Sequence, residues 1–268
     1  MRCFLGLFVV SRQFAFAFQA MGSTTSSGQS GLYSTMKQQQ QAPPTLPELP
    51  SDSKRLFFVR HGEVINPGGD RAVYYGAMDV SLSPLGQKEA LIAAEYLSQF
   101  ELSQVFSSTL SRAIYGAEQV AKYQRAPSGP KVVIQLEGFQ ELDRGDWYAK
   151  TKNEIGAAAM ARFDACDESV TPENGESFPQ LKRRVLAARD QALGMLKMGE
   201  SGALVSHLQV TRCLLSDALG IPTDQMATTI KVGTASITCI DYRMENDVPQ
   251  EQTVHFQSYK PHAGLAQS

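Results

Sequence analysis

Short apolar runs alternate with stretches of helical periodicity along the chain from Ser51 onward. The apolar runs predict buried strands over 57–59, 104–107, 132–134, 203–206 and 237–242. Apolar side chains at helical spacing predict helices after the pair Ser83-Pro84 and over 110–122, 181–195 and 209–219. Because strands and helices alternate, the pattern predicts an α/β fold, a three-layer α/β/α sandwich whose helices cover both faces of a mostly parallel central sheet.

Two of the predicted strands run directly into a histidine. The run 57–59 is followed by Arg60 and His61, and the run 203–206 is followed by His207. Ligands of open α/β sheets bind just beyond the carboxyl ends of the strands, so we expect both histidines to face one cleft. Arg60 makes this cleft cationic and suited to a phosphate group.

Composition and charge fit an enzyme-sized globular domain. The chain has 268 residues, 43% of them hydrophobic, with a net charge of −2 and a pI near 6.1. Such a chain has no global attraction for nucleic acid or an anionic membrane, so we expect neither as a partner. The chain has four cysteines, Cys3, Cys166, Cys213 and Cys239, and none of them form a CxxC pair. This spacing favours apolar core positions for the cysteines over a metal site or a disulfide framework.

Residues 1–50 differ in composition from the rest of the chain. Glu48 is their only acidic residue, and hydroxyl-bearing, glutamine and proline residues crowd 23–50. This composition cannot build a core and predicts a presequence and a disordered linker before a catalytic domain over 51–268. The apolar run 3–10 is too short to span a bilayer and resembles a signal-peptide core. With 15–18 (Ala-Phe-Ala-Phe) it resembles a bipartite plastid presequence; a mitochondrial presequence and an untargeted, cytoplasmic protein are the alternatives.

Three motifs, each placed directly after a predicted strand, resemble the signature of the histidine phosphatase superfamily, in its phosphoglycerate-mutase-like branch. They are Arg60-His61-Gly62-Glu63, Ser107-Ser108-Thr109-Leu110-Ser111-Arg112-Ala113 and Val205-Ser206-His207. Supporting matches extend the resemblance over most of 54–242: Gly76-x-x-Asp79-x-x-Leu82-Ser83-x-x-Gly86, Glu141-x-x-x-Gly145-x-Trp147 and Gly175-Glu176-Ser177. Three spaced motifs in this order are far more specific than a lone Arg-His-Gly.

The resemblance implies a covalent phosphohistidine mechanism. His61 would attack phosphorus as a neutral imidazole, and the positive charge around it would lower its pKa. Arg60 and Arg112, with His207 as a possible imidazolium beside them, would hold the phosphoryl oxygens, so no metal or other cofactor is expected. Glu141 matches the family glutamate that protonates the leaving alkoxide and later activates water.

Several other side chains near these motifs have open roles. The acidic residues Glu137, Asp143 and Asp146 could replace Glu141 as the proton donor. Asn66 lies one position earlier than the asparagine of the mutase motif, and with Tyr75 it completes the predicted substrate-binding set. The basic run 182–184 is typical of the solvated face of a helix.

The function that this resemblance implies is a metal-independent phosphomonoesterase acting on a small phosphorylated metabolite of the sugar phosphate type. A cofactor-dependent phosphoglycerate mutase, a protein or regulatory phosphatase of the same family, and a binding module with an inactive phosphate pocket are the alternatives. Mutases carry a longer segment between the acidic glutamate and the second histidine, which favours the phosphatase. The sequence names neither the physiological substrate nor the oligomeric state.

Overall fold

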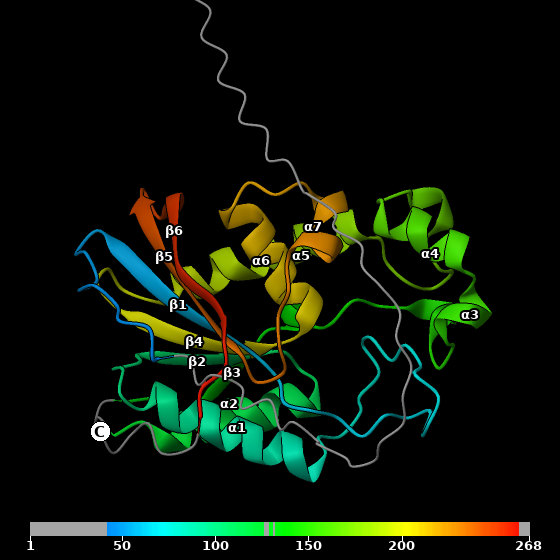
Figure 1. Ribbon diagram of the computed structural model, residues 1–268. Coiled ribbons are helices and arrows are strands. Elements are labelled where there is room, and N and C mark those ends of the chain that lie inside the picture. Colours follow the sequence, from blue (N-terminus) through cyan, green and yellow to red (C-terminus); the bar gives the residue numbers. More distant parts are fainter. Residues whose placement is uncertain (1–41, 126–128, 131, 263–268) are drawn as a thin grey trace, which may run out of the picture. The chain divides into compact units, whose positions relative to one another are not determined.

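The computed structural model describes residues 42–125, 129–130 and 132–262, and within them it contains one mixed sheet (Figure 1). The strands are β1 (Ser53–Arg60), β2 (Gln104–Ser107), β3 (Val133–Gln135), β4 (Ser201–Ser206), β5 (Ile237–Glu245) and β6 (Val248–Tyr259). They lie in the order β3-β2-β4-β1-β5-β6. The pairs of β1 with β4, β4 with β2, and β2 with β3 are parallel, whereas β5 and β6 add an antiparallel edge.

The parallel register places the motif-bearing strand ends side by side. Arg60 lies opposite Ser206, and Ser107 lies opposite Val205. The backbone N–H of His61 donates to the carbonyl oxygen of Ser206 at 2.9 Å, which extends the pairing of β1 and β4 by one residue. The carboxyl ends of β1, β4 and β2 therefore meet at one edge of the sheet, as the sequence predicts.

Helices cover both faces of this sheet (Figure 1). They are α1 (Pro84–Leu97), α2 (Ser111–Tyr123), α3 (Lys152–Ile155), α4 (Ala157–Asp164), α5 (Phe178–Gly194), α6 (Leu208–Ala218) and α7 (Thr223–Thr229). Residues of α1 and α2 share one apolar cluster with the sheet, and residues of α5, α6 and α7 share the other. The predicted three-layer α/β/α arrangement is confirmed.

Local sequence signals fix the helix starts. Ser83 caps α1 by accepting a hydrogen bond from the Gly86 N–H at 3.0 Å, and Pro84 occupies the first helical position, where its missing N–H costs nothing. Ser177 and Gln180 form a capping box at the start of α5. Helix α5 therefore begins at Phe178, three residues before the predicted start of its apolar periodicity.

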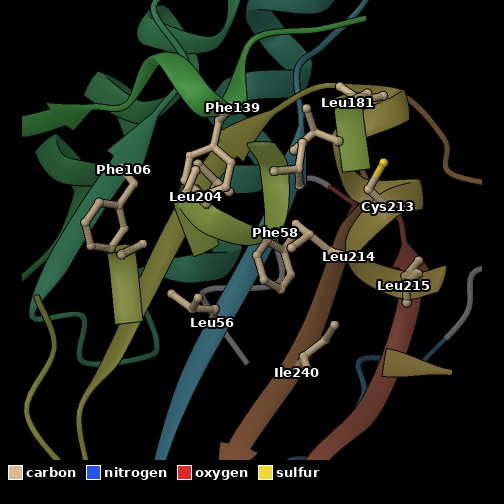
Figure 2. Packing of buried hydrophobic residues seen from close by; sticks show 14 of the residues in the cluster. Leu56, Phe58, Phe106, Phe139, Leu181, Leu204, Cys213, Leu214, Leu215 and Ile240 are labelled. Atoms are coloured by element: carbon tan, nitrogen blue, oxygen red, sulfur yellow. The ribbon is translucent and has the colours of Figure 1, made fainter. Parts of the chain in front are cut away.

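The larger apolar cluster lies between the sheet and the layer of α5 and α6 (Figure 2). Leu56, Phe58 and Leu204 project from the strands toward Leu181 of α5 and Leu214 of α6, and all five are fully buried. This packing fixes the layer that carries His207, because α6 begins directly after that residue.

Cysteine placement agrees with the apolar prediction where the structure describes it. Cys213 lies in the larger cluster and Cys239 in the smaller one, both fully buried and free, whereas Cys166 is half-buried at the edge of the larger cluster. Cys3 lies outside the described residues.

The predicted presequence falls mostly on residues 1–41, which lie outside the described residues. Contacts with the catalytic domain begin within the predicted linker: Leu46 packs against the smaller apolar cluster, and the Pro47 carbonyl accepts a hydrogen bond from Arg55 Nη2 at 3.1 Å. Across the described ranges, every helix is too short or too polar to cross a bilayer.

Candidate active site

His61 occupies the first position after β1 and is almost completely buried, with 4% of its surface exposed. Its Nδ1 lies 2.7 Å from the carbonyl oxygen of Gly62. A carbonyl oxygen can only accept, so Nδ1 carries the proton of the neutral ring and Nε2 keeps its lone pair. The local geometry therefore selects the tautomer in which Nε2 is the nucleophilic atom.

His207 lies beside His61. The two ring centroids are 5.2 Å apart with 60° between the ring planes. His207 is the N-cap of α6, and its Nε2 lies 2.6 Å from the hydroxyl of Ser108. Its Nδ1 is buried and has no hydrogen-bond partner within the described part of the chain. The two strand-end histidines thus share one site, as the pattern of the sequence predicts.

Burial and positive charge keep both imidazoles neutral. Desolvation, followed by the charge of Arg112, lowers the pKa of His61 from 6.5 to about 3, and Arg60 adds to the effect. Desolvation and the neighbouring His61 and Arg112 hold the pKa of His207 well below 6.5. Of the two charge states considered for His207, the structure therefore favours the neutral one in the free protein, because an imidazolium would lie desolvated among other cations.

We predict that the ring nitrogens of His61 and His207 keep neutral-form chemical shifts from pH 8 down to about pH 5, because the pKa of His61 is lowered to about 3 and that of His207 lies well below 6.5. The measurement is a pH titration by NMR of protein with 15N-labelled histidine, with His61→Gln and His207→Gln assigning the signals. A midpoint near 6.5 for either ring would contradict the prediction. The unfolded chain takes up these protons near 6.5, so the free energy of unfolding should fall as the pH drops from 6.5 toward 3.

Two arginines from different motifs lie close to His61. Arg60 is half-buried, and its Nη1 donates to the Val232 carbonyl at 2.8 Å. Arg112 is 1% exposed, and its two terminal nitrogens donate to the carbonyls of Met78 and Gly76 at 2.6 and 2.7 Å. The loop 76–78 thus fixes the Arg112 guanidinium. Nη1 and Nη2, which were expected to bind a phosphate, donate to carbonyl oxygens of this loop instead.

Three residues around His61 carry a buried side-chain nitrogen without a hydrogen-bond partner. Arg60 Nε, Arg112 Nε and His207 Nδ1 are buried, and none has a hydrogen-bond partner among the described residues. Buried polar atoms without partners are rare in folded proteins, and those of charged groups are costly. An anion held between these groups would remove the cost, because an arginine Nε–H is a donor and a protonated His207 Nδ1 would be one too. The arrangement is that of an anion site.

Close backbone packing places the loop that follows His61. A Cβ atom on Gly62 would lie 2.3 Å from the Gly86 carbonyl oxygen, and one on Gly86 would lie 1.9 Å from the Glu63 carbonyl oxygen. Only glycine at both positions allows this contact between the first motif and the start of α1. The Glu63 N–H also donates to Glu89 Oε2 of α1 at 2.8 Å.

Glu141 faces the same cavity as His61. The cavity has a volume of about 250 Å³, and its lining includes Arg60, His61, Tyr75, Glu141, Arg144 and Gln209. The Glu141 carboxylate accepts hydrogen bonds from the backbone N–H groups of Leu142 at 2.8 Å and Gln209 at 3.3 Å. Glu141 is 8% exposed, and because it lines the cavity with His61 it can exchange a proton with a ligand bound there.

The alternative acids have other positions and partners. Asp143 Oδ1 accepts from the Gly145 N–H and the Tyr148 hydroxyl, both at 2.8 Å. Asp146 is exposed and accepts from Asn174, and Glu137 belongs to the 3₁₀ turn Glu137–Phe139. None of the three lines the cavity that contains His61. Geometry therefore favours Glu141.

An ion pair fixes the segment that carries Glu141. Arg184 Nη1 donates to the carbonyls of Gly138 and Gln140, and its Nη2 donates to the Glu141 carbonyl and to Glu176. The solvated-face prediction for 182–184 is therefore wrong for Arg184, which points onto this segment, and for Lys182, whose Nζ donates to the Ser216 hydroxyl. Arg183 alone is exposed as predicted.

We predict that Glu176→Ala lowers kcat/KM on alkyl phosphates about 10- to 100-fold, because a displaced Glu141 no longer meets the leaving oxygen. The loss on nitrophenyl phosphate, which needs less help from an acid, should be smaller. Glu251→Ala, which removes an exposed partner of Arg243, is the matched control and should change neither rate. Unchanged alkyl phosphate kinetics in Glu176→Ala would show that the ion pair does not position the acid.

Asn66 and Tyr75 differ in how they face the site. Tyr75 lines the cavity and its ring lies 5.5 Å from the Arg112 guanidinium carbon. Asn66 is bound by its own loop, since its Nδ2 donates to the Arg71 carbonyl at 2.8 Å and its Oδ1 accepts from the Gly68 N–H at 3.0 Å. It lines a neighbouring hollow that also borders His61. Substrate contact by either residue stays a prediction.

Two residues of the site were not singled out from the sequence. Ser108 lies within the second motif and contacts His207, and a hydroxyl directly after a strand end was a usable signal for it. Arg144 lines the cavity, yet it stands in an irregular segment between two 3₁₀ turns, where no periodicity indicates which side chains are buried. Among the described residues, no three His, Cys, Asp or Glu side chains form a metal-binding group.

Known proteins match this chain in sequence and in fold. The model of the histidine phosphatase superfamily (branch 1) matches residues 56–253. A glucosyl-3-phosphoglycerate phosphatase of Mycolicibacterium vanbaalenii is 32% identical over 68% of this chain and 82% of its own length. A probable phosphoglycerate mutase of Yersinia enterocolitica is 28% identical over 70% and 85%. The structure of YhfR from Bacillus stearothermophilus superposes with a TM-score of 0.65 at 25% identity, covering 76% of this chain and 96% of YhfR.

The family match includes the strand ends that carry both histidines, the Arg112 motif and the Glu141 segment. It begins within β1 and ends within β6, so it spans the whole sheet. The chain therefore belongs to the histidine phosphatase superfamily (branch 1) and is a phosphoric monoester hydrolase.

Proposed function

We propose that the enzyme hydrolyses small phosphomonoesters through a phosphohistidine formed on His61. The observation that carries this proposal is the pairing of two buried neutral histidines, 5.2 Å apart, with unpartnered N–H groups of Arg60 and Arg112. A neutral imidazole has the lone pair that an attack on phosphorus requires, and the N–H groups can hold the phosphoryl oxygens during it.

In the first step, His61 Nε2 forms a bond to phosphorus while the bond from phosphorus to the ester oxygen breaks. Glu141 gives its proton to that oxygen, which leaves as an alcohol. In the second step, Glu141 takes a proton from water, the water oxygen bonds to phosphorus, and the bond from phosphorus to Nε2 breaks. Inorganic phosphate leaves, and both side chains return to their initial states.

Positive charge serves both steps. The unpartnered Nε–H groups of Arg60 and Arg112 are free to donate to the phosphoryl oxygens, and the loop 76–78 fixes the Arg112 guanidinium before substrate binds. A phosphoryl dianion next to His207 favours protonation of Nδ1, which then becomes a third donor, while the Ser108 hydroxyl holds Nε2 in place. Donors fixed in advance need no reorganisation during the reaction.

The same side chains supply the charge that a metal would otherwise provide. We therefore predict that hydrolysis of nitrophenyl phosphate keeps its rate in excess EDTA, measured as phosphate release before and after chelation. Readdition of Mg²⁺, Mn²⁺ or Zn²⁺ should leave the rate unchanged. A loss of activity in EDTA that one of these ions restores would contradict the mechanism.

The substrate is a small phosphorylated metabolite, and sugar phosphates are the proposed type. A cavity of about 250 Å³ accommodates a small ester, and the relative from Mycolicibacterium is named for a phosphorylated sugar derivative. Phosphate release across sugar phosphates, sugar bisphosphates, carboxylated sugar phosphates and phosphopeptides tests the proposal. Preference for phosphopeptides would favour the protein phosphatase alternative.

A mutase is the second candidate, because a relative at 28% identity is named a probable phosphoglycerate mutase. A mutase returns the phosphoryl group from histidine to a second hydroxyl of the substrate, whereas a phosphatase gives it to water. Incubation with 3-phosphoglycerate and NMR of the phosphorus nuclei distinguishes the two. We expect free phosphate, and accumulation of 2-phosphoglycerate without phosphate would favour the mutase.

We also propose an organellar location, with the plastid favoured over the mitochondrion and the cytoplasm. The apolar run near the N-terminus, the segment 15–18 and the acid-poor, hydroxyl-rich stretch that follows support it. Mass spectrometry of the native protein should find a mature N-terminus between about residues 19 and 50. Retention of Met1 would contradict the proposal.

A further inference from the structure

Arg144 lies buried in the wall of the catalytic cavity. It is 6% exposed, and its guanidinium carbon lies 4.7 Å from the centre of the Tyr74 ring and 5.4 Å from that of Phe163. Gly76 makes room for its stem, since a Cβ atom there would lie 2.7 Å from Arg144 Cγ. Aromatic rings and a glycine thus hold the side chain in one place.

Within the described part of the chain, this guanidinium has aromatic neighbours but no hydrogen-bond or ion-pair partner. Its Nη1 is buried without a hydrogen bond, and Glu141 and Asp164 act on it through space without forming an ion pair. Arg55 and Arg189 are exposed to the same small extent, and each forms an ion pair, with Asp241 and Asp217 respectively. A buried unpaired charge is costly, and desolvation accordingly lowers the pKa of Arg144. Such a cation is typical of a site that receives an anion from outside.

The position of Arg144 indicates where in the catalytic cavity such an anion would bind. Arg144 and His61 line one cavity, so a ligand whose phosphoryl group meets His61 extends toward Arg144. Val73, Leu142 and Leu208 supply apolar wall in the same cavity. Arg60 and Arg112 already serve the phosphoryl group, which leaves the Arg144 guanidinium for a second charged group of the ligand.

We propose that Arg144 binds a second anionic group of the substrate, a carboxylate or a second phosphate, and so selects phosphomonoesters that carry an additional negative charge. This inference rests on the proposed function, and it makes Arg144 a specificity-determining residue. A guanidinium offers a planar fork that matches either group, so the chemistry is shared and the substrates of the test distinguish the two.

The experiment compares esters that differ only in the second charge. 3-Phosphoglycerate and glycerol 3-phosphate differ by a carboxylate in place of a hydroxymethyl group, and fructose 1,6-bisphosphate and fructose 6-phosphate differ by a phosphate. Phosphate release gives kcat and KM for the wild type, for Arg144→Met and for Arg144→Lys. Arg183→Met is the matched control, because it removes an exposed arginine of α5.

We expect Arg144→Met to lose about 10- to 100-fold in kcat/KM on at least one doubly charged ester, the range for a hydrogen bond between charged groups, and to change little on its singly charged counterpart. Arg144→Lys should recover part of the loss. The pair of substrates that shows the effect tells carboxylate from phosphate. Arg183→Met should behave as the wild type on all four esters.

Equal losses on charged and neutral esters would overturn the inference, because they indicate a structural role for Arg144. Unchanged kinetics in Arg144→Met would overturn it as well. Thermal unfolding of each variant shows whether the protein is folded, and Arg144→Lys keeps the test decisive if Arg144→Met is not folded.

The wild type gives a second test. Equal kcat/KM on glycerol 3-phosphate and 3-phosphoglycerate, and on fructose 6-phosphate and the bisphosphate, would contradict this inference and leave the proposed function intact. Release of phosphate from no ester contradicts the proposed function as well.

Discussion

Replacing His61 with alanine is expected to reduce kcat on every phosphomonoester by about 10⁴-fold or more, the scale of loss when a covalent nucleophile is removed from other enzymes. Among the side chains that the structure describes, only His61 combines a lone pair on Nε2, a fixed tautomer and a position among the unpartnered donors. Alanine leaves these donors in place but removes the atom that bonds to phosphorus. Phosphate release under saturating substrate measures the effect.

The control for this variant is His255→Ala. His255 is half-buried on β6, and its Nε2 lies 2.7 Å from Asp241, outside the catalytic cavity. Its replacement should leave kcat unchanged, which separates loss of the nucleophile from loss of an imidazole elsewhere in the domain. Activity of His61→Ala within tenfold of the wild type would remove His61 from the nucleophilic role.

Glu141→Gln is expected to lose about 10²- to 10⁴-fold in kcat/KM on alkyl phosphates, the usual contribution of a general acid, and far less on nitrophenyl phosphate. An alkoxide is a strong base and needs a proton as it leaves, whereas nitrophenolate leaves well without one. Glutamine keeps the size of the side chain and one acceptor oxygen for the Leu142 N–H group, which makes the shorter of the two hydrogen bonds, but it cannot donate the exchangeable proton.

Arg60→Ala and Arg112→Ala are the comparison for this prediction. Both arginines act on the phosphoryl group, so their loss should lower kcat/KM comparably for the two kinds of ester. If Glu141→Gln lost kcat/KM equally on both kinds of ester, Glu141 would be excluded as the acid. The search would then return to Asp143 and Asp146, although neither lines the cavity.

The fold was predictable where the hydrophobic pattern is strong. The parallel strands and the helices that cover them have the apolar runs and caps that indicate them, and their ends differ from the predicted ones by a few residues. The pattern did not indicate β6, whose residues alternate irregularly between exposed and half-buried, nor the short helices α3 and α4. Helix α3 does have a local signal, the capping box of Thr151 and Glu154, whereas β6 depends on its pairing with β5.

The site was predictable where the motifs follow strand ends, since topology alone brings His61 and His207 together. Arg184 was misjudged because a basic run on a helix looks the same whether it meets solvent or a neighbouring segment. The neutral state of His207 depends on its complete burial, and the isolation of Arg144 depends on which carboxylates lie near it. Both features depend on how close segments that are remote in the sequence lie in the fold.

Isolation of the phosphorylated enzyme tests the central claim most directly. Glu141→Gln mixed with radiolabelled nitrophenyl phosphate should accumulate label, because the first step needs little acid help and the second step lacks the residue that activates water. After rapid quenching, label on a histidine survives alkali and is lost in acid. We expect this behaviour, one labelled peptide that contains His61, and no label in the double variant His61→Ala/Glu141→Gln. Label that survives acid, maps to another peptide or persists in the double variant would contradict the account.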